Sequence, residues 1–234
     1  MFTEVAFHAY SLSHGIAVGV VLCLGLLSFF LSSEKTPRMR EFIRYTLITL
    51  LLFSTVSGIL SVILRYGFSS EAWQVILHYE LPFYLCDIVS FVLVAALWFK
   101  NQRAAEVGYV WGIAGTAQGL VTPVLNYEFP SLEFLFFFIQ HGVVPISAMI
   151  VILRYKLIPL EGAYLRVWFW TFVYFAITLF INWLLGVNYG FLNSKPPSAT
   201  ALDYLGVYPW YLVSLHLVAA VVFAVLLMPF RKNA

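Results

Sequence analysis

The sequence predicts an all-α membrane protein, folded as one bundle of seven transmembrane helices. Of the 234 residues, 62% are hydrophobic and only 10% are charged, whereas soluble domains are closer to half apolar and a quarter charged. The apolar residues form seven runs of roughly 20, the length that crosses a hydrocarbon core about 30 Å thick. These runs use most of the chain, so we expect a single domain over residues 1–234.

The seven predicted spans follow one another with short connections. They cover residues 14–32, 42–64, 81–99, 106–125, 134–153, 166–187 and 208–230. No pair of interrupted half-helices is evident, of the kind that forms the binding site of inverted-repeat transporters. The segment before the first span lacks the basic region and cleavage site of a secretory signal, so we expect that span to be retained.

The basic residues predict the orientation of the bundle. Eleven of the thirteen Lys and Arg residues lie in every second gap between the runs or after the last run: Lys35, Arg38, Arg40, Arg44, Lys100, Arg103, Arg154, Lys156, Arg166, Arg231 and Lys232. Basic loops stay on the cytoplasmic side of a membrane. We therefore expect the N-terminus outside, the C-terminus in the cytoplasm, and a multi-pass location in the cell (plasma) membrane.

With this orientation, the polar residues of different spans share one depth. Cys86 and Asp87 lie roughly 8 Å below the outer edge of the third span, at 1.5 Å per residue, and His141 lies some 10 Å deep in the fifth. The outer halves of the other spans hold Gln118, Thr122, Asn182, Asn188 and His216. Polar groups inside a span normally face the bundle interior or a wet cavity. The pattern predicts an outward-facing polar pocket, although such side chains also simply join helices.

Cys86 and His141 are the candidate catalytic residues. A thiolate is a nucleophile that a nearby imidazole favours, and Cys plus His suffices for covalent acyl transfer. Either Asp87 or His216 could orient or charge the imidazole of His141.

Other polar residues at this depth are candidates for supporting roles. The side chains of Gln118, Thr122 and Asn182 could donate hydrogen bonds to an oxyanion. A metal site built from His141, His216 and Asp87 is the competing use, but these residues lack the tight spacing of metal motifs. We therefore expect no metal or other cofactor.

Several remaining residues have simpler interpretations. Cys23 lies among apolar residues in the first span and is expected to be a packing residue. His8, His14 and His78 are expected to be solvated, and Trp210 suits a membrane-interface anchor.

Ordered motifs over spans three to seven resemble the bacterial YwaF-like integral membrane proteins. Residues 81–87 (LPFYLCD) resemble the family pattern LPxHLCD, residues 115–123 resemble GTxQALxTP, and residues 137–142 match FFxxHG. Residues 188–196 resemble NYxFLxxKP, with Lys195, and residues 209–211 match PWY, with Trp210.

That family is distantly similar to the animal transmembrane protein 164 family of phospholipid acyltransferases. The resemblance implies that Cys86 is an acyl carrier and that His141 is its base. It also implies supporting roles for Lys195 and Trp210, which lie in the shared motifs. The chain departs from the pattern at one position, because Tyr84 stands where the family has a histidine.

Three functions are compatible with these residues. The first is a lipid acyltransferase or acyl hydrolase at the outer leaflet, with membrane lipids as partners and a homo-oligomer as a further option. The second is a non-enzymatic binder or transporter of a small extracellular molecule or lipid, and the third is a structural subunit of a membrane complex. No basic, aromatic-rich tract suggests nucleic acid, and the seventh span lacks the lysine of a retinal pump.

Overall fold

The computed structural model describes residues 5–230, and within that range it contains helices but no strand. The α-helices are α1 (Leu12–Leu31), α2 (Pro37–Tyr66), α3 (Ser70–Val75), α4 (Leu85–Phe99), α5 (Gln102–Ala114), α6 (Leu132–Leu153), α7 (Ala163–Leu185) and α8 (Trp210–Leu227). A π-helical turn, η1 (Ile76–Glu80), follows α3. Short 3-10 turns are η2 (Thr116–Leu120), η3 (Tyr189–Phe191), η4 (Ala201–Leu205) and η5 (Met228–Phe230).

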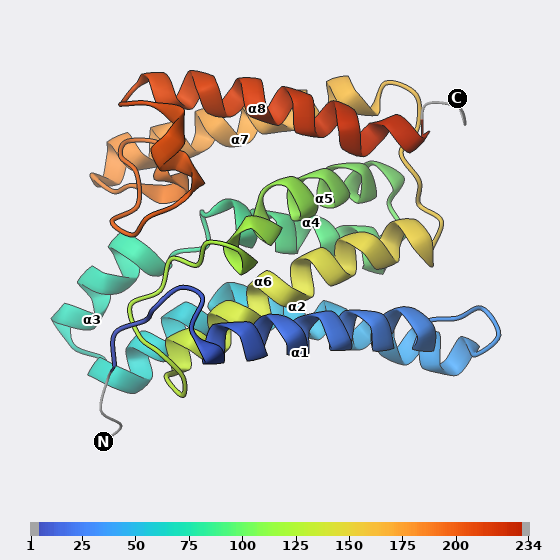
Figure 1. Cartoon of the computed structure of the whole chain (residues 1–234), viewed down its shortest axis with the longest axis horizontal. Helices are drawn as coiled ribbons and strands as arrows, with labels where there is room; N and C mark the ends of the chain where they lie inside the picture. The colour runs from blue at the N-terminus through green and yellow to red at the C-terminus, as the bar shows by residue number, and fades with distance from the viewer. Residues whose placement is uncertain (1–4, 231–234) are drawn as a thin grey trace.

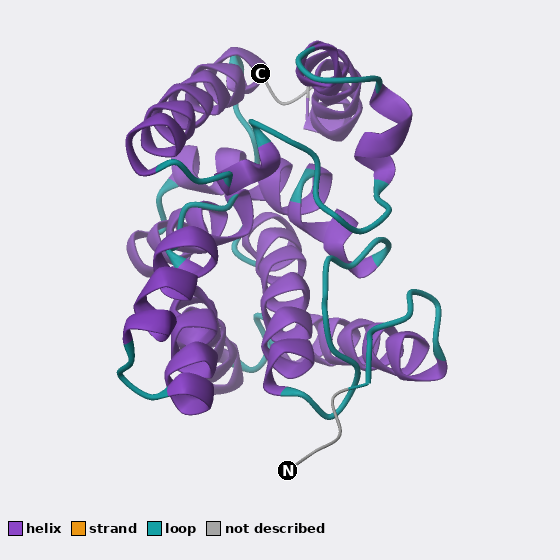
Figure 2. Ribbon diagram, turned by 90° about the vertical axis from the view of Figure 1, so that its left-hand side faces the viewer, coloured by secondary structure: helices purple, strands orange, loops and turns teal. Residues whose placement is uncertain are grey.

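The long helices lie roughly along one axis of the molecule, in layers (Figure 1). One outer layer holds α7 and α8, the middle holds α4 and α5, and α6, α2 and α1 lie on the other side. Figure 2 looks at the bundle from one end, so that most of these helices are foreshortened. Because α7 and α8 contact the rest of the bundle mainly through α5, this pair is the most loosely attached layer.

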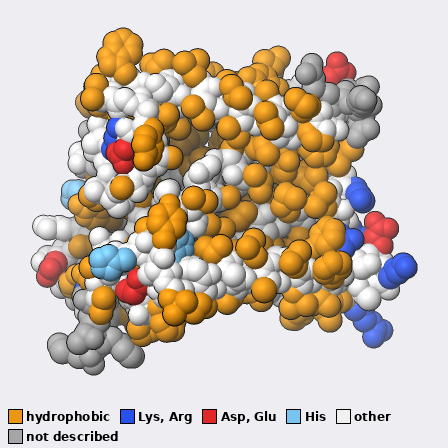
Figure 3. Space-filling view, viewed as in Figure 1, with side chains coloured by type: hydrophobic (Ala, Val, Ile, Leu, Met, Phe, Trp, Pro, Cys, Tyr) orange, Lys and Arg blue, Asp and Glu red, His pale blue; other side chains and the backbone are white. Residues whose placement is uncertain are grey.

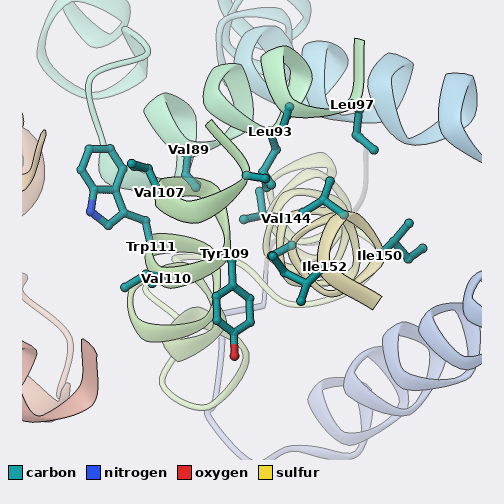
Figure 4. Close-up of a cluster of buried hydrophobic side chains, with 14 of the residues drawn as sticks. Val89, Leu93, Leu97, Val107, Tyr109, Val110, Trp111, Val144, Ile150 and Ile152 are labelled. Atoms are coloured by element: carbon teal, nitrogen blue, oxygen red, sulfur yellow. The ribbon is translucent and has the colours of Figure 1, made fainter. Parts of the chain in front are cut away.

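The apolar core lies where α4, α5 and α6 meet (Figure 4). Val89 and Leu93 of α4, Val110 of α5 and Val144 of α6 are all completely buried. Two of these helices approach closely because Gly112 has no side chain, and a Cβ there would lie 3.0 Å from that of Ala148. Because lipid is as apolar as these side chains, close van der Waals packing, rather than removal from water, holds the three helices together.

Five helices are long and apolar enough to cross a membrane: α1, α2, α6, α7 and the α8–η5 segment Trp210–Phe230. A bent pair, Ser70–Glu80 with Leu85–Phe99, raises this to six if it forms one span. The membrane-protein prediction is therefore confirmed for the part of the chain that the structure describes. Seven spans and the orientation of the termini remain predictions.

The predicted ranges need correction at two spans. The third was predicted over 81–99 but its α-helix begins only at Leu85, after a 72° bend. The fourth was predicted over 106–125, but α5 covers Gln102–Ala114 and continues as η2. Both spans are thus interrupted, although the sequence showed no pair of interrupted half-helices, and the connection between α2 and α4 contains α3 and η1.

Local chemistry explains both interruptions. Pro82 disfavours a helical conformation at the residue before it, and Leu81 is accordingly extended, with φ −68° and ψ 143°. Gly115 ends α5, where a Cβ would lie 2.6 Å from Leu85 and 2.9 Å from the carbonyl oxygen of Trp111. Irregular backbone at membrane depth is tolerated where it is buried in protein or lines a cavity, and both breaks line the cavity described below.

Basic residues gather at one end of the molecule (Figure 3). There Arg40 Nη2 donates a hydrogen bond to the Arg154 carbonyl (2.7 Å), and Arg154 Nε donates to the Phe29 carbonyl (2.7 Å). Arg166 pairs with the fully buried Glu106 through two bonds of 2.8 and 2.9 Å. The predicted basic residues Arg231 and Lys232 lie outside the described residues.

Candidate functional site

A cavity of about 1750 Å³ opens at the end of the bundle opposite the basic cluster. It exceeds the roughly 300–1,000 Å³ typical of small-molecule pockets. Its walls come from α2, the α3–α4 connection, α5, η2, the segment between η2 and α6, α6, α7, α8 and the segment between α7 and α8. The residues that line it include most of the polar positions predicted from the sequence: Cys86, Asp87, Gln118, Thr122, His141, Asn188, Lys195 and His216.

Cys86 is the second residue of α4, directly after the break at Pro82. Its side chain is half-buried and lines the cavity. The N-terminus of a helix carries partial positive charge from unpaired backbone N–H groups. The Cys86 thiol therefore lies beside these N–H groups, at the wall of the cavity.

Asp87 joins α4 to α6. Its Oδ1 accepts a 2.6 Å hydrogen bond from Nε2 of Gln140, and its Oδ2 accepts a 3.2 Å bond from the backbone N–H of Tyr84. The second bond caps the first turn of α4. Cys86 precedes Asp87 and His141 follows Gln140, so this tie fixes the two candidate catalytic residues at one level of the bundle.

The ring of His141 is held by its own helix. Nδ1 lies 2.9 Å from the carbonyl oxygen of Phe137. Because a carbonyl only accepts, the network assigns the proton to Nδ1 and leaves a lone pair on Nε2. The ring stacks on Phe137, with centroids 3.9 Å apart, and its Cδ2–Nε2 edge faces Gly119, where a Cβ would lie 2.1 Å from Cδ2 and 2.7 Å from Nε2.

Neither Asp87 nor His216 hydrogen-bonds His141 among the described residues, so the expectation that one of them orients its ring through a hydrogen bond was wrong. Asp87 is bonded to Gln140 and Tyr84. His216 bonds the Leu212 carbonyl through Nδ1 (2.7 Å) and packs between aromatic rings of α7. Among the described residues, no hydrogen bond joins Cys86 to His141, although both line the same cavity.

The remaining predicted residues divide into cavity walls and scaffold. Gln118 and Thr122 line the cavity from η2 and the turn after it. Asn188 and Lys195 line its rim, where Asn188 holds the turn at Ser194 (2.8 and 2.9 Å) and the Lys195 ammonium lies 5.7 Å from the centre of the Tyr211 ring.

Two predicted residues do not line the cavity. Asn182 is buried and bonds both backbone groups of Tyr189, at 2.8 and 2.9 Å, so it shapes the turn after α7. Trp210 is 67% exposed at the start of α8, which fits a membrane-interface anchor.

Sequence reasoning missed three polar groups of the cavity. Glu80 projects toward α2, where Gly58 makes room for its carboxylate: a Cβ on Gly58 would overlap Oε2. Thr116 of η2 is buried, with no partner for its hydroxyl among the described residues. Ser54, Ser57 and Ser61 line the cavity from one face of α2, and their spacing of three and four residues was a readable signal.

Two other expectations about single residues were wrong. His14 is buried rather than solvated, and its Nε2 lies 2.9 Å from the Leu120 carbonyl at the end of η2. Cys23 is exposed on α1 rather than packed inside. Within residues 5–230, no group of three or more His, Cys, Asp or Glu side chains could hold a metal ion.

The N-terminal segment closes one side of the cavity mouth. Glu128, on the rim, accepts hydrogen bonds from the hydroxyls of Ser13 (2.5 Å) and Ser11 (3.1 Å) and from two backbone N–H groups, of His8 and Phe129. Partial burial by itself raises the pKa of Glu128, but these hydrogen bonds outweigh it, so the pKa lies below its ordinary value. This carboxylate therefore ties residues 8–13 to the rim in its ionised form.

Comparison with known proteins gives one match. The model of the TMEM164 family matches residues 8–227, which is nearly the whole chain and includes every wall of the cavity. No curated protein and no solved structure matches. The match supports the broader of the two resemblances found in the sequence, and the narrower YwaF-like assignment remains a prediction.

Proposed function

We propose, from the premise that this chain belongs to the TMEM164 family, that it is a membrane-embedded lipid acyltransferase or acyl hydrolase in which Cys86 carries the acyl group. Family membership indicates a membrane protein with a lipid-related function. The observation that supports the finer proposal is the shared cavity. It holds a thiol at a helix N-terminus and an imidazole on the facing helix, and the Asp87–Gln140 bond sets both at one level.

The proposed reaction has two steps. The Cys86 thiol passes its proton to Nε2 of His141, and the sulfur attacks the ester carbonyl of a lipid. A thioester forms, the ester C–O bond breaks, and the leaving alkoxide takes the proton from His141. A lysolipid hydroxyl or water then attacks the thioester and restores the thiol. Catalytic contacts are often long before substrate binds, so the missing Cys86–His141 hydrogen bond is compatible with this role.

The proposal also places this site in the outer half of a seven-span bundle. Seven helices alternate in direction between the two ends of the molecule, α3 excepted (Figure 1). At 1.5 Å per residue, α4 and α5 measure about 22 and 20 Å, short of a bilayer. η2 follows α5 directly, and α4 is preceded, across the 72° bend, by the segment Ser70–Glu80. The basic cluster at the opposite end would lie in the cytoplasm. This orientation is tested in intact cells with a tag at either terminus of the protein. A protease or thiol reagent added outside should reach the N-terminal tag and not the C-terminal one.

Activity of three variants tests the catalytic proposal. Purified protein is reconstituted with phosphatidylcholine carrying a labelled acyl chain and with a lysolipid acceptor, and labelled product and free fatty acid are measured. We expect Cys86→Ser to abolish turnover and His141→Ala to lower it by about 10²–10⁴-fold. Cys23→Ser, at the exposed second cysteine, is the matched control and should be unaffected. Equal rates for wild type and Cys86→Ser contradict acyl transfer.

A non-enzymatic lipid binder is the second candidate. Tyr84 stands where the YwaF-like family has a histidine, and its ring packs against Tyr189 and Phe191. If the family histidine activates the thiol, this chain would bind lipid without turning it over. Lipid binding that persists in Cys86→Ser, with no turnover in wild type, would favour this candidate.

A further inference from the structure

The cavity has an apolar branch that the catalytic proposal does not use. The face of α8 that lines it carries Leu215, Val218, Ala219 and Val222, at helical spacing. The polar side chain on this face is His216, whose Nδ1 bonds the Leu212 carbonyl (2.7 Å). The opposing walls are Trp111 and Ala114 of α5, with Thr171 and Tyr174 of α7. From the level of Leu215 to that of Phe223, the branch runs roughly 12 Å along α8. We call this branch the α8 slot.

The walls of the α8 slot offer few free polar groups. The indole N–H of Trp111 donates to Oγ1 of Thr171 (2.9 Å), and that hydroxyl donates to the Val167 carbonyl (2.8 Å). The far end is formed by Phe223, which is 5% exposed and packs on Trp168 with ring centroids 5.2 Å apart. Burying a polar ligand group here without a partner would be costly.

The α8 slot opens in two directions. At its outer end it joins the part of the cavity lined by Cys86, Asp87 and His141, which we call the polar chamber. Tyr174 lines the cavity at this junction, and its hydroxyl donates to the Phe83 carbonyl (3.2 Å), three residues before Cys86. On its side, Val218 both lines the cavity and is 48% exposed on the surface. Figure 3 shows the surface hollowed below the upper layer of helices, on the face where α8 lies in front.

We propose that the α8 slot binds one hydrocarbon chain of a membrane lipid, with the polar end of that lipid in the chamber beside Cys86. One wall of the slot is α8, which belongs to a segment long and apolar enough to span a membrane. The side opening of the slot therefore faces lipid tails rather than water. An apolar slot that joins a polar chamber suits an amphiphile whose hydrocarbon chain fills the slot and whose polar end lies in the chamber. The inference rests on the proposed function for the identity of the ligand, but the slot does not require that the lipid react.

A photoreactive lipid tests this proposal. Protein carrying Cys86→Ser is placed in nanodiscs with a phosphatidylcholine whose acyl chain ends in a diazirine, and adducts are mapped by mass spectrometry. We expect adducts on Trp111 and Thr171, because Trp111 is only 4% exposed and bulk lipid does not reach it. Adducts confined to outward-facing residues such as Leu217 and Val221 would overturn the proposal.

A pair of neighbouring substitutions supplies the matched control. Val222→Phe fills the slot and should remove the Trp111 adduct, whereas Val221→Phe, on a side chain 64% exposed, should leave it. Ala219→Val is the milder variant if Val222→Phe does not fold, and it should reduce the same adduct. An unchanged Trp111 adduct in either folded slot variant contradicts the assignment. Because all these proteins carry Cys86→Ser, the labelling reports only whether the slot is occupied. Its failure is therefore distinct from a failure of acyl transfer, which is measured in protein with Cys86.

Discussion

Gly119 determines where the ring of His141 can lie. A Cβ at this position would come within 2.1 Å of the imidazole, closer than any real contact allows. Gly119→Ala must therefore displace the ring or the η2 turn. We expect a destabilisation of about 1–3 kcal/mol from overpacking and a loss of turnover close to that of His141→Ala.

Thermal unfolding and turnover of Gly119→Ala, measured together, check this expectation. Gly19→Ala is the control, because a Cβ on Gly19 of α1 meets nothing within 4 Å. Wild-type turnover in a stably folded Gly119→Ala protein would show that the ring position does not matter for the reaction.

At the same scale, the sequence predicted which residues share a depth but not which of them touch. Cys86 and His141 were paired by counting residues from the outer edge of each span, and both line one cavity. The bond between Asp87 and Gln140 could not be predicted, because depth along a helix says nothing about the direction a side chain faces. The burial of His14 depends on η2, an element that no pattern indicated.

At the level of elements, one buried ion pair attaches α7 to the core. Glu106 of α5 is fully buried, and it accepts two bonds from Arg166 and one from the Leu160 N–H (2.9 Å). Removing one partner of such a pair leaves a buried charge uncompensated. We expect Arg166→Leu to cost about 2–4 kcal/mol, since the carboxylate is buried but the guanidinium side is partly exposed.

Chemical unfolding in a lipid-like detergent measures this cost. The comparison is Arg44→Leu, which breaks the more exposed Arg44–Glu41 pair within α2 and should cost about 1 kcal/mol or less. Similar losses for the two variants would mean that Glu106 does not depend on Arg166 for its charge.

The tie between the N-terminal segment and the cavity rim should depend on pH. The pKa of Glu128 is lower in the folded protein than its ordinary value of 4.5, so ionised Glu128 favours the tied form. This contribution is complete above about pH 4.5. It is lost as the pH falls through the lower, folded pKa.

Hydrogen–deuterium exchange of residues 5–13 tests this pH dependence. We expect the protection of these amides, meaning their exchange rate relative to the intrinsic rate at the same pH, to fall in wild type only below about pH 4.5. In Glu128→Gln it should be low already at neutral pH. Exchange in the variant that stays slow at pH 7 would mean that the backbone bridge between Ala6 and Tyr127 holds the segment without the carboxylate.

The breaks before α4 and after α5 could not be predicted from the pattern of apolar residues. Apolar runs located the long helices to within a few residues, because hydropathy along the chain is a direct record of burial in lipid. The same runs continue across the breaks at Leu81 and Gly115. Pro82 and Gly115 are the residues that indicate an interruption locally. Neither residue by itself shows whether the helix only kinks there or ends.

At the scale of the whole molecule, charge and cavity lie at opposite ends. Basic residues gather at one end (Figure 3), as the alternation of basic residues along the sequence predicts, and the polar residues that line the cavity come from the opposite ends of the helices. Composition alone indicated a membrane bundle, and the family match over residues 8–227 supports it. The size and branching of the cavity could not be predicted, because they depend on how loosely α7 and α8 pack against α5.

Acyl transfer through Cys86 requires that a lipid reach this thiol and leave its acyl chain there. Intact-protein mass spectrometry after incubation with phosphatidylcholine of a single chain length tests it most directly. We expect one added acyl group that maps to Cys86 and is removed by hydroxylamine. It should be absent in Cys86→Ser and unchanged in Cys23→Ser. No adduct on Cys86, under conditions where the diazirine lipid labels the α8 slot, would contradict acyl transfer and leave a lipid-binding protein.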